Sequence, residues 1–457
     1  MTLPSASPDH LGLDSDRLHR LERWLQLQVE QNRVAGASVL VARHGSVALF
    51  KAAGKAQLGP AHGKEQLFAR DTLTRLYSMT KPVTTVAAMM LHEQGHFQLD
   101  DPIAWYLPAF AETPVWTGTA PPADTLDVDA LFRHVEPQQQ PVTVRHLMTH
   151  TSGLTYSFMN ATPVDQYYRD NDLVFPGSSS TLAELVDRLA KAPLLCQPGT
   201  RWNYSVATDV LGRLVEIWSG LPLDEFFSRH IFSPLKMPDT GFHVPDDQHH
   251  RLADLMGPAG GGDLGRIGGA ATGTQWLAGS GGPSTMSAHA RGTILDPPAL
   301  LEPGSASVFG CAPTLFSGGG GLVGSIDDFA RFAQMLLNAG ELDGVRLLSR
   351  KSVQFMRKNQ LPGNVDMAAM GQAVWSETSY EGIGFGLGFA VVLDPVKAQM
   401  ITSPGEHHWG GAASTFFWID PAEDLFVVFL TQLYPSSTYP LRRELRTVVY
   451  QALVDHE

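Results

Sequence analysis

Apolar positions recur every three or four residues in several parts of the chain, a spacing typical of helices with one buried face. In residues 14–32, Leu18, Leu21, Trp24, Leu25 and Val29 share such a face. The same period predicts helices over residues 181–192, 209–220, 223–231, 326–337 and 441–453, with Ser325 as the expected cap of the fourth. The middle of the chain is therefore expected to be mainly helical.

Apolar runs without a helical period lie near both ends of the chain. Residues 36–51 are interpreted as a hairpin with a turn at His44 and Gly45, and the runs 384–393, 415–419 and 425–430 predict further strands. Strands at both ends with helices between them favour an α/β (α+β) fold, in which an antiparallel sheet flanked by helices is built from both termini. We expect residues 1–76 and 315–457 to form this α/β domain and residues 77–314 to form an inserted, mainly helical domain with long loops.

Two stretches predict loops. Residues 112–141 are rich in Pro, Asp, Thr and Gln, which indicates a surface excursion, and glycine dominates residues 257–282. The glycine-rich stretch is not interpreted as a phosphate cradle, because no strand precedes it and no Gly-Lys-Ser/Thr follows it. Long loops of this kind often lie over a site.

Bulk properties restrict the class of partner. The chain has 457 residues, 43% hydrophobic and 17% charged, and a net charge of −13. This charge argues against nucleic acid and anionic membranes as main partners, and no apolar run approaches the ~18 residues of a membrane span. Residues 1–16 lack the pattern of a secretory signal, so a cytoplasmic location is expected. The two cysteines, Cys196 and Cys311, form no Cys-x-x-Cys pair and are expected to be buried free thiols.

The chemistry begins at Ser78 and Lys81. Val83, Val86, Ala87 and Met90 predict a helix, and Pro82 is tolerated only near its first turn, so the helix is expected to begin close to Ser78. Lys81 then shares a face with Ser78, and its amine can approach the hydroxyl as a base once burial lowers its pKa. The tetrapeptide alone favours a simpler interpretation, a serine cap followed by a solvated lysine.

Tyr204 is the candidate for passing a proton to the leaving group. It follows the turn Pro198-Gly199-Thr200 and precedes a helix, so its phenol can project from a loop toward a cleft. The alternative is a core tyrosine packed beside Trp202.

A candidate oxyanion hole lies in Trp409-Gly410-Gly411-Ala412, where two glycines allow the backbone to approach a ligand closely. An edge strand here would offer the Ala412 N–H opposite that of Ser78. A shift of one residue would make Gly411 the donor instead, and a simple turn between strands is the alternative to both.

His146 and His150 are four residues apart, as metal ligands on one helix face would be. No His-Glu-x-x-His glutamate accompanies them and no third ligand is evident, so structural histidines are favoured over a metal site.

Several motifs occur together in a known order: Ser78-Met79-Thr80-Lys81, the segment 145–154, Tyr204-Ser205-Val206 after its turn, the turn 318–322, and Trp409-Gly410-Gly411. Over roughly residues 15–453 the chain resembles the serine β-lactamase-like superfamily, specifically the class C β-lactamase-like branch of esterases. The resemblance implies catalytic Ser78, Lys81 and Tyr204, an oxyanion hole of the Ser78 and Ala412 N–H groups, substrate contacts at Trp409, Gly410 and Gly411, and an active site between the two domains. It implies no metal or cofactor.

Two departures from the family pattern are informative. Class C β-lactamases and related peptidases carry Tyr-x-Asn and Lys-Thr-Gly, whereas this chain has Val206 and Trp409 at the Asn and Lys positions. The missing groups would help to hold the amide and carboxylate of a β-lactam. The pattern instead resembles carboxylesterases of the branch that act on short-chain esters.

The resulting expectation is a carboxylic-ester hydrolase that acts on a small-molecule ester through an acyl-enzyme on Ser78. An acyltransferase would use the same residues, and a β-lactamase or D-amino-acid peptidase with weak lactam hydrolysis also stays open. A non-catalytic binding module is disfavoured by the intact Ser78, Lys81 and Tyr204. Trp105, Trp116, Trp202, Trp409 and the loop 257–282 are candidates for shaping the pocket. Nothing in the sequence specifies the acyl chain, the alcohol or the oligomeric state.

Overall fold

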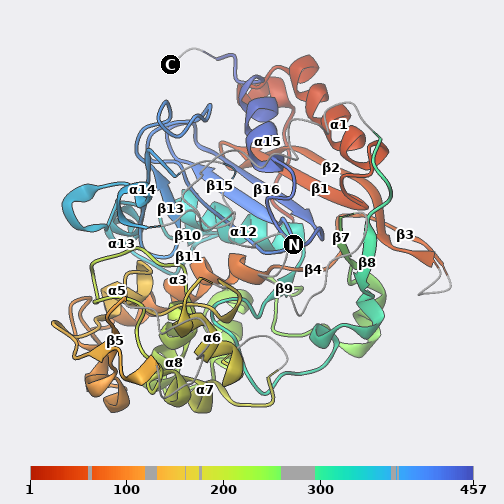
Figure 1. The fold of residues 1–457 in the computed structure, drawn as a ribbon. Coiled ribbons are helices and arrows are strands. Elements are labelled where there is room, and N and C mark those ends of the chain that lie inside the picture. The colour runs from red at the N-terminus through yellow and green to blue at the C-terminus, as the bar shows by residue number, and fades with distance from the viewer. Residues whose placement is uncertain are drawn as a thin grey trace.

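The computed structural model describes residues 2–59, 64–118, 131–159, 161–173, 178–258, 294–371, 377 and 380–455. Within these ranges a large antiparallel sheet lies between helices on both faces, and a group of helices lies beside it (Figure 1). The predicted class, a mixed α/β fold around an antiparallel sheet from both termini, is confirmed.

The sheet joins the two ends of the chain in the strand order β12-β13-β14-β15-β16-β1-β2-β3. The junction is the pairing of β1 with β16, from Ala37 opposite Thr431 to Arg43 opposite Leu425. The strands are β1 (Gly36–Arg43), β2 (Ser46–Gln57), β3 (Gln66–Leu67), β12 (Ile383–Phe385), β13 (Ala390–Val392), β14 (His407–Gly410), β15 (Phe416–Asp420) and β16 (Leu425–Thr431).

Short two-stranded ladders connect loops elsewhere in the molecule. They are β4 (Thr74–Arg75) with β9 (Val323–Gly324), β5 (Val115–Trp116) with β6 (Val135–Glu136), β7 (Leu255–Gly257) with β8 (Ala299–Glu302), and β10 (Glu341–Leu342) with β11 (Val345–Arg346).

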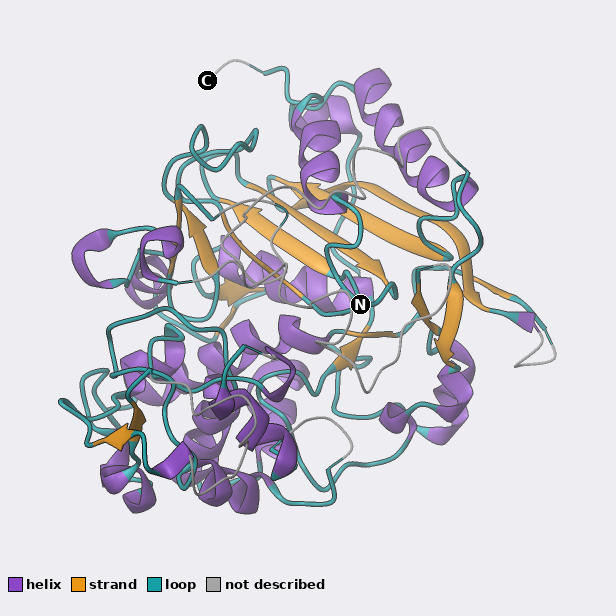
Figure 2. Cartoon of the chain, in the orientation of Figure 1, coloured by secondary structure: helices purple, strands orange, loops and turns teal. Residues whose placement is uncertain are grey.

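The sheet is buried on both faces, which explains why its central strands are continuously apolar. Along β1, Val39 and Val41 pack into a core with α1 and α15, whereas Leu40 points into the larger core that contains α12. Figure 2 shows the strands in orange between these helices. The α-helices are α1 (Ser15–Glu30), α3 (Thr80–Glu93), α5 (Val144–Met148), α6 (Pro163–Asp170), α7 (Leu182–Leu189), α8 (Ala207–Ser219), α9 (Leu223–Phe227), α10 (Ser233–Leu235), α12 (Ile326–Leu337), α13 (Arg350–Met356), α14 (Met367–Met370) and α15 (Leu441–Tyr450).

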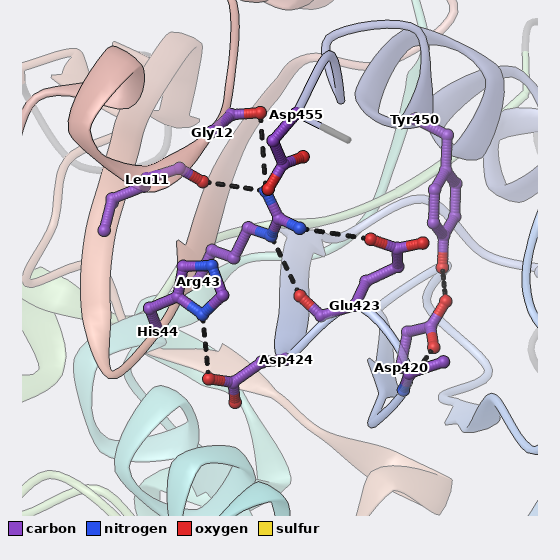
Figure 3. A network of polar contacts seen from close by, with 10 residues as sticks. Leu11, Gly12, Arg43, His44, Asp420, Glu423, Asp424, Tyr450 and Asp455 are labelled. Carbon is purple, nitrogen blue, oxygen red and sulfur yellow. Dashed lines mark hydrogen bonds and ion pairs between the residues drawn. The ribbon is translucent and has the colours of Figure 1, made fainter. Parts of the chain in front are cut away.

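Arg43 ties the two ends of the chain together at the end of β1 (Figure 3). Its Nη1 donates to the carbonyl oxygen of Leu11 at 2.9 Å and to Asp455 Oδ2 at 2.7 Å. Its Nε donates to the carbonyl oxygen of Glu423 at 2.9 Å, in the connection between β15 and β16. One buried guanidinium therefore holds the N-terminal segment, a sheet connection and the C-terminal tail, which supports assembly of the sheet from both ends.

One prediction of detail is confirmed only in position, and two are wrong. Ser325 occupies the N-cap position of α12, but its side chain makes no capping hydrogen bond. The predicted strand over residues 384–393 folds back at Gly388, which has φ 89°, and forms the hairpin β12–β13. Cys196 is buried as expected, but Cys311 is exposed, because it lies in a loop that follows a 3-10 turn rather than in the core.

Residues 259–282 of the predicted glycine-rich loop 257–282 and residues 119–130 of the excursion 112–141 lie outside the described residues. The domain boundaries after residues 76 and 314 stay a prediction. None of the helices in the described ranges combines the length and apolar character needed to cross a membrane.

Candidate active site

Ser78 lies at the start of the helix that the sequence predicts. A 3-10 turn over Tyr77–Met79 leads directly into α3, and the N–H of Met79 donates to the carbonyl oxygen of Leu76 at 3.1 Å. The N–H of Ser78 precedes this bond, so the helix supplies no acceptor for it. Tyr77 has φ 46°, a left-handed conformation that is costly for a residue with a side chain. The surrounding fold therefore holds the backbone before Ser78 in a strained turn.

The amine of Lys81 is buried behind Ser78 and contacts three oxygen atoms. Its Nζ lies 3.2 Å from Ser78 Oγ, 2.9 Å from Tyr156 OH and 2.6 Å from the carbonyl oxygen of Gly319. A carbonyl can only accept, so one N–H of the amine is committed to Gly319. A neutral amine then has one further N–H and one lone pair to share between the two hydroxyl groups, so it can accept the proton of Ser78 while it donates to Tyr156.

Burial lowers the pKa of Lys81 to about 7, and the nearby negative charge of Asp209 acts in the opposite direction. A substantial fraction of the amine is therefore neutral near pH 7. Burial also raises the pKa of the Asp209 carboxyl, while the charge of Lys81 and the hydrogen bonds from Ser317 and Gly319 lower it.

The turn 318–322 connects Asp209 to Lys81 through one residue, Gly319. Asp209 Oδ1 accepts hydrogen bonds from Ser317 Oγ at 2.6 Å and from the N–H of Gly319 at 2.9 Å. The carbonyl of the same Gly319 receives the Lys81 hydrogen bond. A Cβ on Gly319 would lie 2.4 Å from Asp209 Oδ2, so this approach requires glycine.

Neither Asp209 nor Tyr156 belongs to a motif that the sequence presents. Asp209 lies in the first turn of α8, where acidic residues are common for reasons of helix stability alone. Tyr156 follows the predicted motif 145–154 by two residues. Its position near that motif was the one available signal, and it did not indicate a contact with Lys81.

Tyr204 is held in place by the motif that contains His150. The N–H of Gly199, in the predicted turn at φ 79°, donates to the carbonyl oxygen of Thr151 at 2.7 Å. The N–H of Asn203 donates to the carbonyl oxygen of His150 at 2.8 Å. The segment before Tyr204 is thus fixed at both ends against residues 150–151.

The phenol of Tyr204 donates to Ser78 Oγ at 2.6 Å. Lys81 Nζ lies 4.7 Å from the centre of the same ring, and the ring of Trp409 is 5.5 Å away. Burial raises the pKa of Tyr204 above its usual value, against the lowering effect of the Ser78 hydrogen bond. The phenol is therefore protonated at neutral pH and is suited to donating a proton.

The strand that carries the predicted oxyanion hole is interior rather than at an edge, because β14 lies between β13 and β15. Its ladder with β13 ends at His408, however, whereas its ladder with β15 continues to Gly410. The last residues of β14 are therefore unpaired on the β13 side. The prediction that β14 lies at an edge of the sheet is therefore wrong. The end of β14 nevertheless has unpaired backbone on one side, as an edge strand would have.

Beyond β14 the chain makes a turn in which the two candidate oxyanion donors, the N–H groups of Gly411 and Ala412, differ in their hydrogen bonding. The N–H of Gly411 donates to the carbonyl oxygen of Thr415 at 2.8 Å, and the N–H of Ser414 donates to Gly411 O at 3.1 Å. Ala412 is the second residue of this turn, and no described residue accepts a hydrogen bond from its N–H. Gly411 also lies against Leu76, because a Cβ there would be 2.3 Å from Leu76 O. The turn therefore lies beside the residues that precede Ser78.

A pocket open to solvent, with about 710 Å³ of space including its mouth, contains these groups. Of the tryptophans proposed to shape it, Trp202 and Trp409 line it, whereas Trp105 is 68% exposed and Trp116 is not among the lining residues. Its lining includes Ser78, Tyr204, His408, Trp409, Gly410, Gly411, Ala412, Phe416 and Arg442.

The two histidines have structural contacts. His146 Nδ1 accepts the N–H of Thr143 at 3.2 Å and so caps α5, and His150 packs 4.9 Å from the ring of Tyr204. In the part of the chain that the structure describes, no three His, Cys, Asp or Glu side chains gather as metal ligands would.

Comparison with known proteins gives a consistent result. A model of the family described as Beta-lactamase matches residues 21–451. Esterase EstB of Burkholderia gladioli is 29% identical over 464 residues, which cover 98% of this chain and 100% of EstB. Protein Rv1367c of Mycobacterium tuberculosis is 33% identical over 372 residues, which cover 80% of this chain and 79% of that protein.

Among solved structures, EstCE1, described as a hydrolase with promiscuous acyltransferase activity, has a TM-score of 0.70 and 27% sequence identity. The match covers 95% of this chain and 99% of EstCE1. The similarity thus extends over nearly the whole fold.

Proposed function

The chain belongs to the Beta-lactamase family and is a serine hydrolase of that fold, and on this premise we propose that it is a carboxylesterase that cleaves small esters through an acyl-enzyme on Ser78. One observation carries the proposal: Ser78 Oγ lies within hydrogen-bond distance of both Lys81 Nζ and Tyr204 OH. Trp409, in the same pocket, presents an apolar wall where related lactam-hydrolysing enzymes are expected to have a lysine.

In the acylation step, the neutral amine of Lys81 takes the Ser78 proton as Oγ attacks the ester carbonyl. Tyr204 then gives its proton to the departing alcohol, which leaves a phenolate beside the Lys81 ammonium. The lowered pKa of Lys81 and the raised pKa of Tyr204 favour return of a proton from the ammonium to the phenolate. The acyl-enzyme therefore regains a neutral amine, which activates water for deacylation and restores Ser78.

The N–H groups of Ser78 and Ala412 would stabilise the tetrahedral oxyanion. The Ser78 N–H lies in the first turn of a helix, and no described residue accepts a hydrogen bond from the Ala412 N–H, whereas the Gly411 N–H donates to Thr415 O. These contacts favour Ala412 over Gly411 as the second donor.

Ala412→Pro removes this N–H and is expected to lower kcat/KM for p-nitrophenyl butyrate about 100- to 1,000-fold, mainly through kcat. The matched control Ala412→Gly keeps the N–H and should stay within about tenfold of wild type. Thermal melting first establishes that both variants are folded. Steady-state kinetics then measures kcat and KM of each. A folded Ala412→Pro variant as active as Ala412→Gly would exclude Ala412 as a donor.

The pH dependence follows from Lys81. Since the pKa of its amine is lowered to about 7, the neutral form increases with pH, and kcat/KM should rise through pH 7 and level off above it. Asp209 raises the pKa of Lys81, so Asp209→Asn should move the midpoint of the rise to lower pH. A pH–kcat/KM profile of both proteins tests this. An upward shift, or a profile that falls between pH 6 and 8, would contradict the role of Lys81 as the base.

The proposed acyl-enzyme is tested by mixing the purified protein with excess p-nitrophenyl butyrate. The expected result is a burst of p-nitrophenol and, after acid quenching, a protein mass increased by one butyryl group located on Ser78. Ester cleavage with the butyryl group on a different residue would overturn the proposal.

Acyl transfer is a second candidate, because EstCE1 is described as having promiscuous acyltransferase activity. The same residues would serve, with an alcohol in place of water at deacylation. Adding a primary alcohol to the ester assay distinguishes them: a transferase forms the new ester at the expense of free acid, whereas a strict hydrolase does not.

A further inference from the structure

Two neighbouring threonines of α3, Thr84 and Thr85, use their hydroxyl groups in different ways, although both side chains are buried. A threonine hydroxyl inside a helix can donate to the carbonyl oxygen four residues earlier, and Thr85 Oγ1 does so, at 3.0 Å from Lys81 O. The hydroxyl of Thr84 lies 3.4 Å from the corresponding carbonyl oxygen but 2.7 Å from that of Gly318. Its main hydrogen bond therefore leaves the helix and reaches the turn that contains Gly319.

One peptide unit of that turn is held at both of its polar ends. The carbonyl oxygen of Gly318 and the N–H of Gly319 belong to the same peptide bond. The oxygen accepts a hydrogen bond from Thr84 on α3 at 2.7 Å, and the N–H donates to Asp209 Oδ1 on α8 at 2.9 Å. Because a peptide unit is planar, two hydrogen bonds from separate helices at its opposite ends fix its orientation.

Close packing also restricts this turn. A Cβ on Gly318 would lie 2.8 Å from Thr208 O on α8 and 3.1 Å from Thr84 Cγ2 on α3, so the space between the two helices suits glycine. At the far end of the turn, the N–H of Leu322 donates to Thr80 Oγ1 at 3.1 Å. Side chains of α3 thus hold the turn at both of its ends.

The fixed peptide unit determines where the acceptor of the Lys81 amine lies. The next carbonyl along the chain, that of Gly319, accepts the Lys81 Nζ hydrogen bond at 2.6 Å. Reorientation of the peptide unit before it would move this carbonyl relative to the amine. The amine would then no longer have one N–H committed to Gly319, and its lone pair would no longer be restricted to the direction of Ser78 and Tyr156.

We propose that Thr84 is a positioning residue for Lys81, which acts through the Gly318–Gly319 peptide unit and keeps the amine oriented toward Ser78. This inference rests on the proposed ester hydrolysis at Ser78 and adds a residue outside the catalytic set on which the rate of that reaction depends. Removal of the Thr84 hydroxyl leaves the buried carbonyl of Gly318 without its hydrogen bond, which favours reorientation of the peptide unit.

The test replaces each threonine by valine, which removes the hydroxyl and keeps the shape of the side chain. Thr84→Val is expected to lower kcat for p-nitrophenyl butyrate about 10- to 100-fold and to change KM less than about threefold. Thr85→Val is the matched control, because its hydroxyl donates within its own helix, and kcat should stay within about threefold of wild type. Thr84→Ser keeps the hydroxyl and should also stay within about threefold of wild type.

The pH profile distinguishes a positioning role from a general structural one. The carbonyl of Gly319 stabilises the ammonium form of Lys81, so loss of this contact should move the midpoint of the rise in kcat/KM about 0.5 to 1 pH unit lower in Thr84→Val. The midpoint of Thr85→Val should not move. Four other titratable groups lie near the amine, and both variants retain them: Asp209, Tyr156, Tyr204 and His150.

Thermal unfolding of each variant accompanies the kinetics. If Thr84→Val does not fold, Thr84→Ala and Thr85→Ala provide the same comparison without the added methyl group. Equal kcat values and equal midpoints in the Thr84 and Thr85 variants would overturn the proposal, and so would a loss of activity that Thr84→Ser shares. Failure of wild type to cleave p-nitrophenyl butyrate in a Ser78-dependent manner would instead refute the proposed function.

Discussion

Ser78→Ala is expected to lower kcat/KM for p-nitrophenyl butyrate by about 10⁵-fold or more, because the proposed mechanism has no second nucleophile. Substrate binding should change little, since the methyl group of alanine fits where the hydroxyl was. Steady-state assays with high enzyme concentration measure the residual rate. Ser436→Ala, which removes another hydroxyl from the pocket lining, is the control and should stay within about tenfold of wild type.

Covalent labelling gives an independent readout of the same variant. An aryl phosphonate should modify the wild type at Ser78 and should not modify Ser78→Ala. Labelling of the variant at a nearby residue, together with retained ester cleavage, would show that the nucleophile has been assigned to the wrong side chain.

Lys81→Met is expected to lower kcat/KM about 10³- to 10⁴-fold, because Ser78 then loses the base that takes its proton. Lys81→Arg separates basicity from charge. A guanidinium keeps the positive charge but cannot accept a proton at neutral pH, so this variant should be about as inactive as Lys81→Met. Kinetics of the three proteins at pH 8 make the comparison.

Thermal unfolding of the Lys81 variants tests whether their losses of activity come from loss of the folded state. Lys81 is 1% exposed, so its replacement by an apolar side chain of similar length should not lower the unfolding midpoint substantially. If Lys81→Arg retained activity within about tenfold of wild type, the lysine would be acting through its charge and the proposed general-base role would be wrong.

The residues with a local sequence signal could be predicted well. Ser78 and Lys81 are three residues apart, and Pro82 restricts where their helix begins, so the spacing alone predicts that they share a face. Tyr204 follows a turn with Gly199 at φ 79° and precedes α8, which places it on a loop. The structure brings these three side chains together.

The groups that surround Lys81 could not be predicted, because their roles depend on contacts between distant segments. Tyr156 is 75 residues from Lys81, and Asp209 is 110 residues from the Gly319 N–H that it holds.

In the fold, too, features that depend on neighbours in sequence could be predicted, whereas features that depend on distant segments could not. Periodicity predicts the helices and the β1–β2 hairpin, since these depend on neighbours in sequence. The strand order is not contained in any local pattern, so β14 was expected at an edge although β13 covers its first half. Cys311 was expected in the core because cysteine is usually buried, and its loop position overrides that tendency.

The central claim is that this member of the Beta-lactamase family hydrolyses esters in preference to lactams. The most direct test measures kcat/KM of the wild type for p-nitrophenyl butyrate and for a chromogenic cephalosporin under the same conditions. We predict that ester cleavage is faster by at least about 100-fold, because Val206 and Trp409 replace the groups that would hold a lactam. Cephalosporin cleavage as fast as ester cleavage would contradict the account and would show that these two replacements do not determine the choice of substrate.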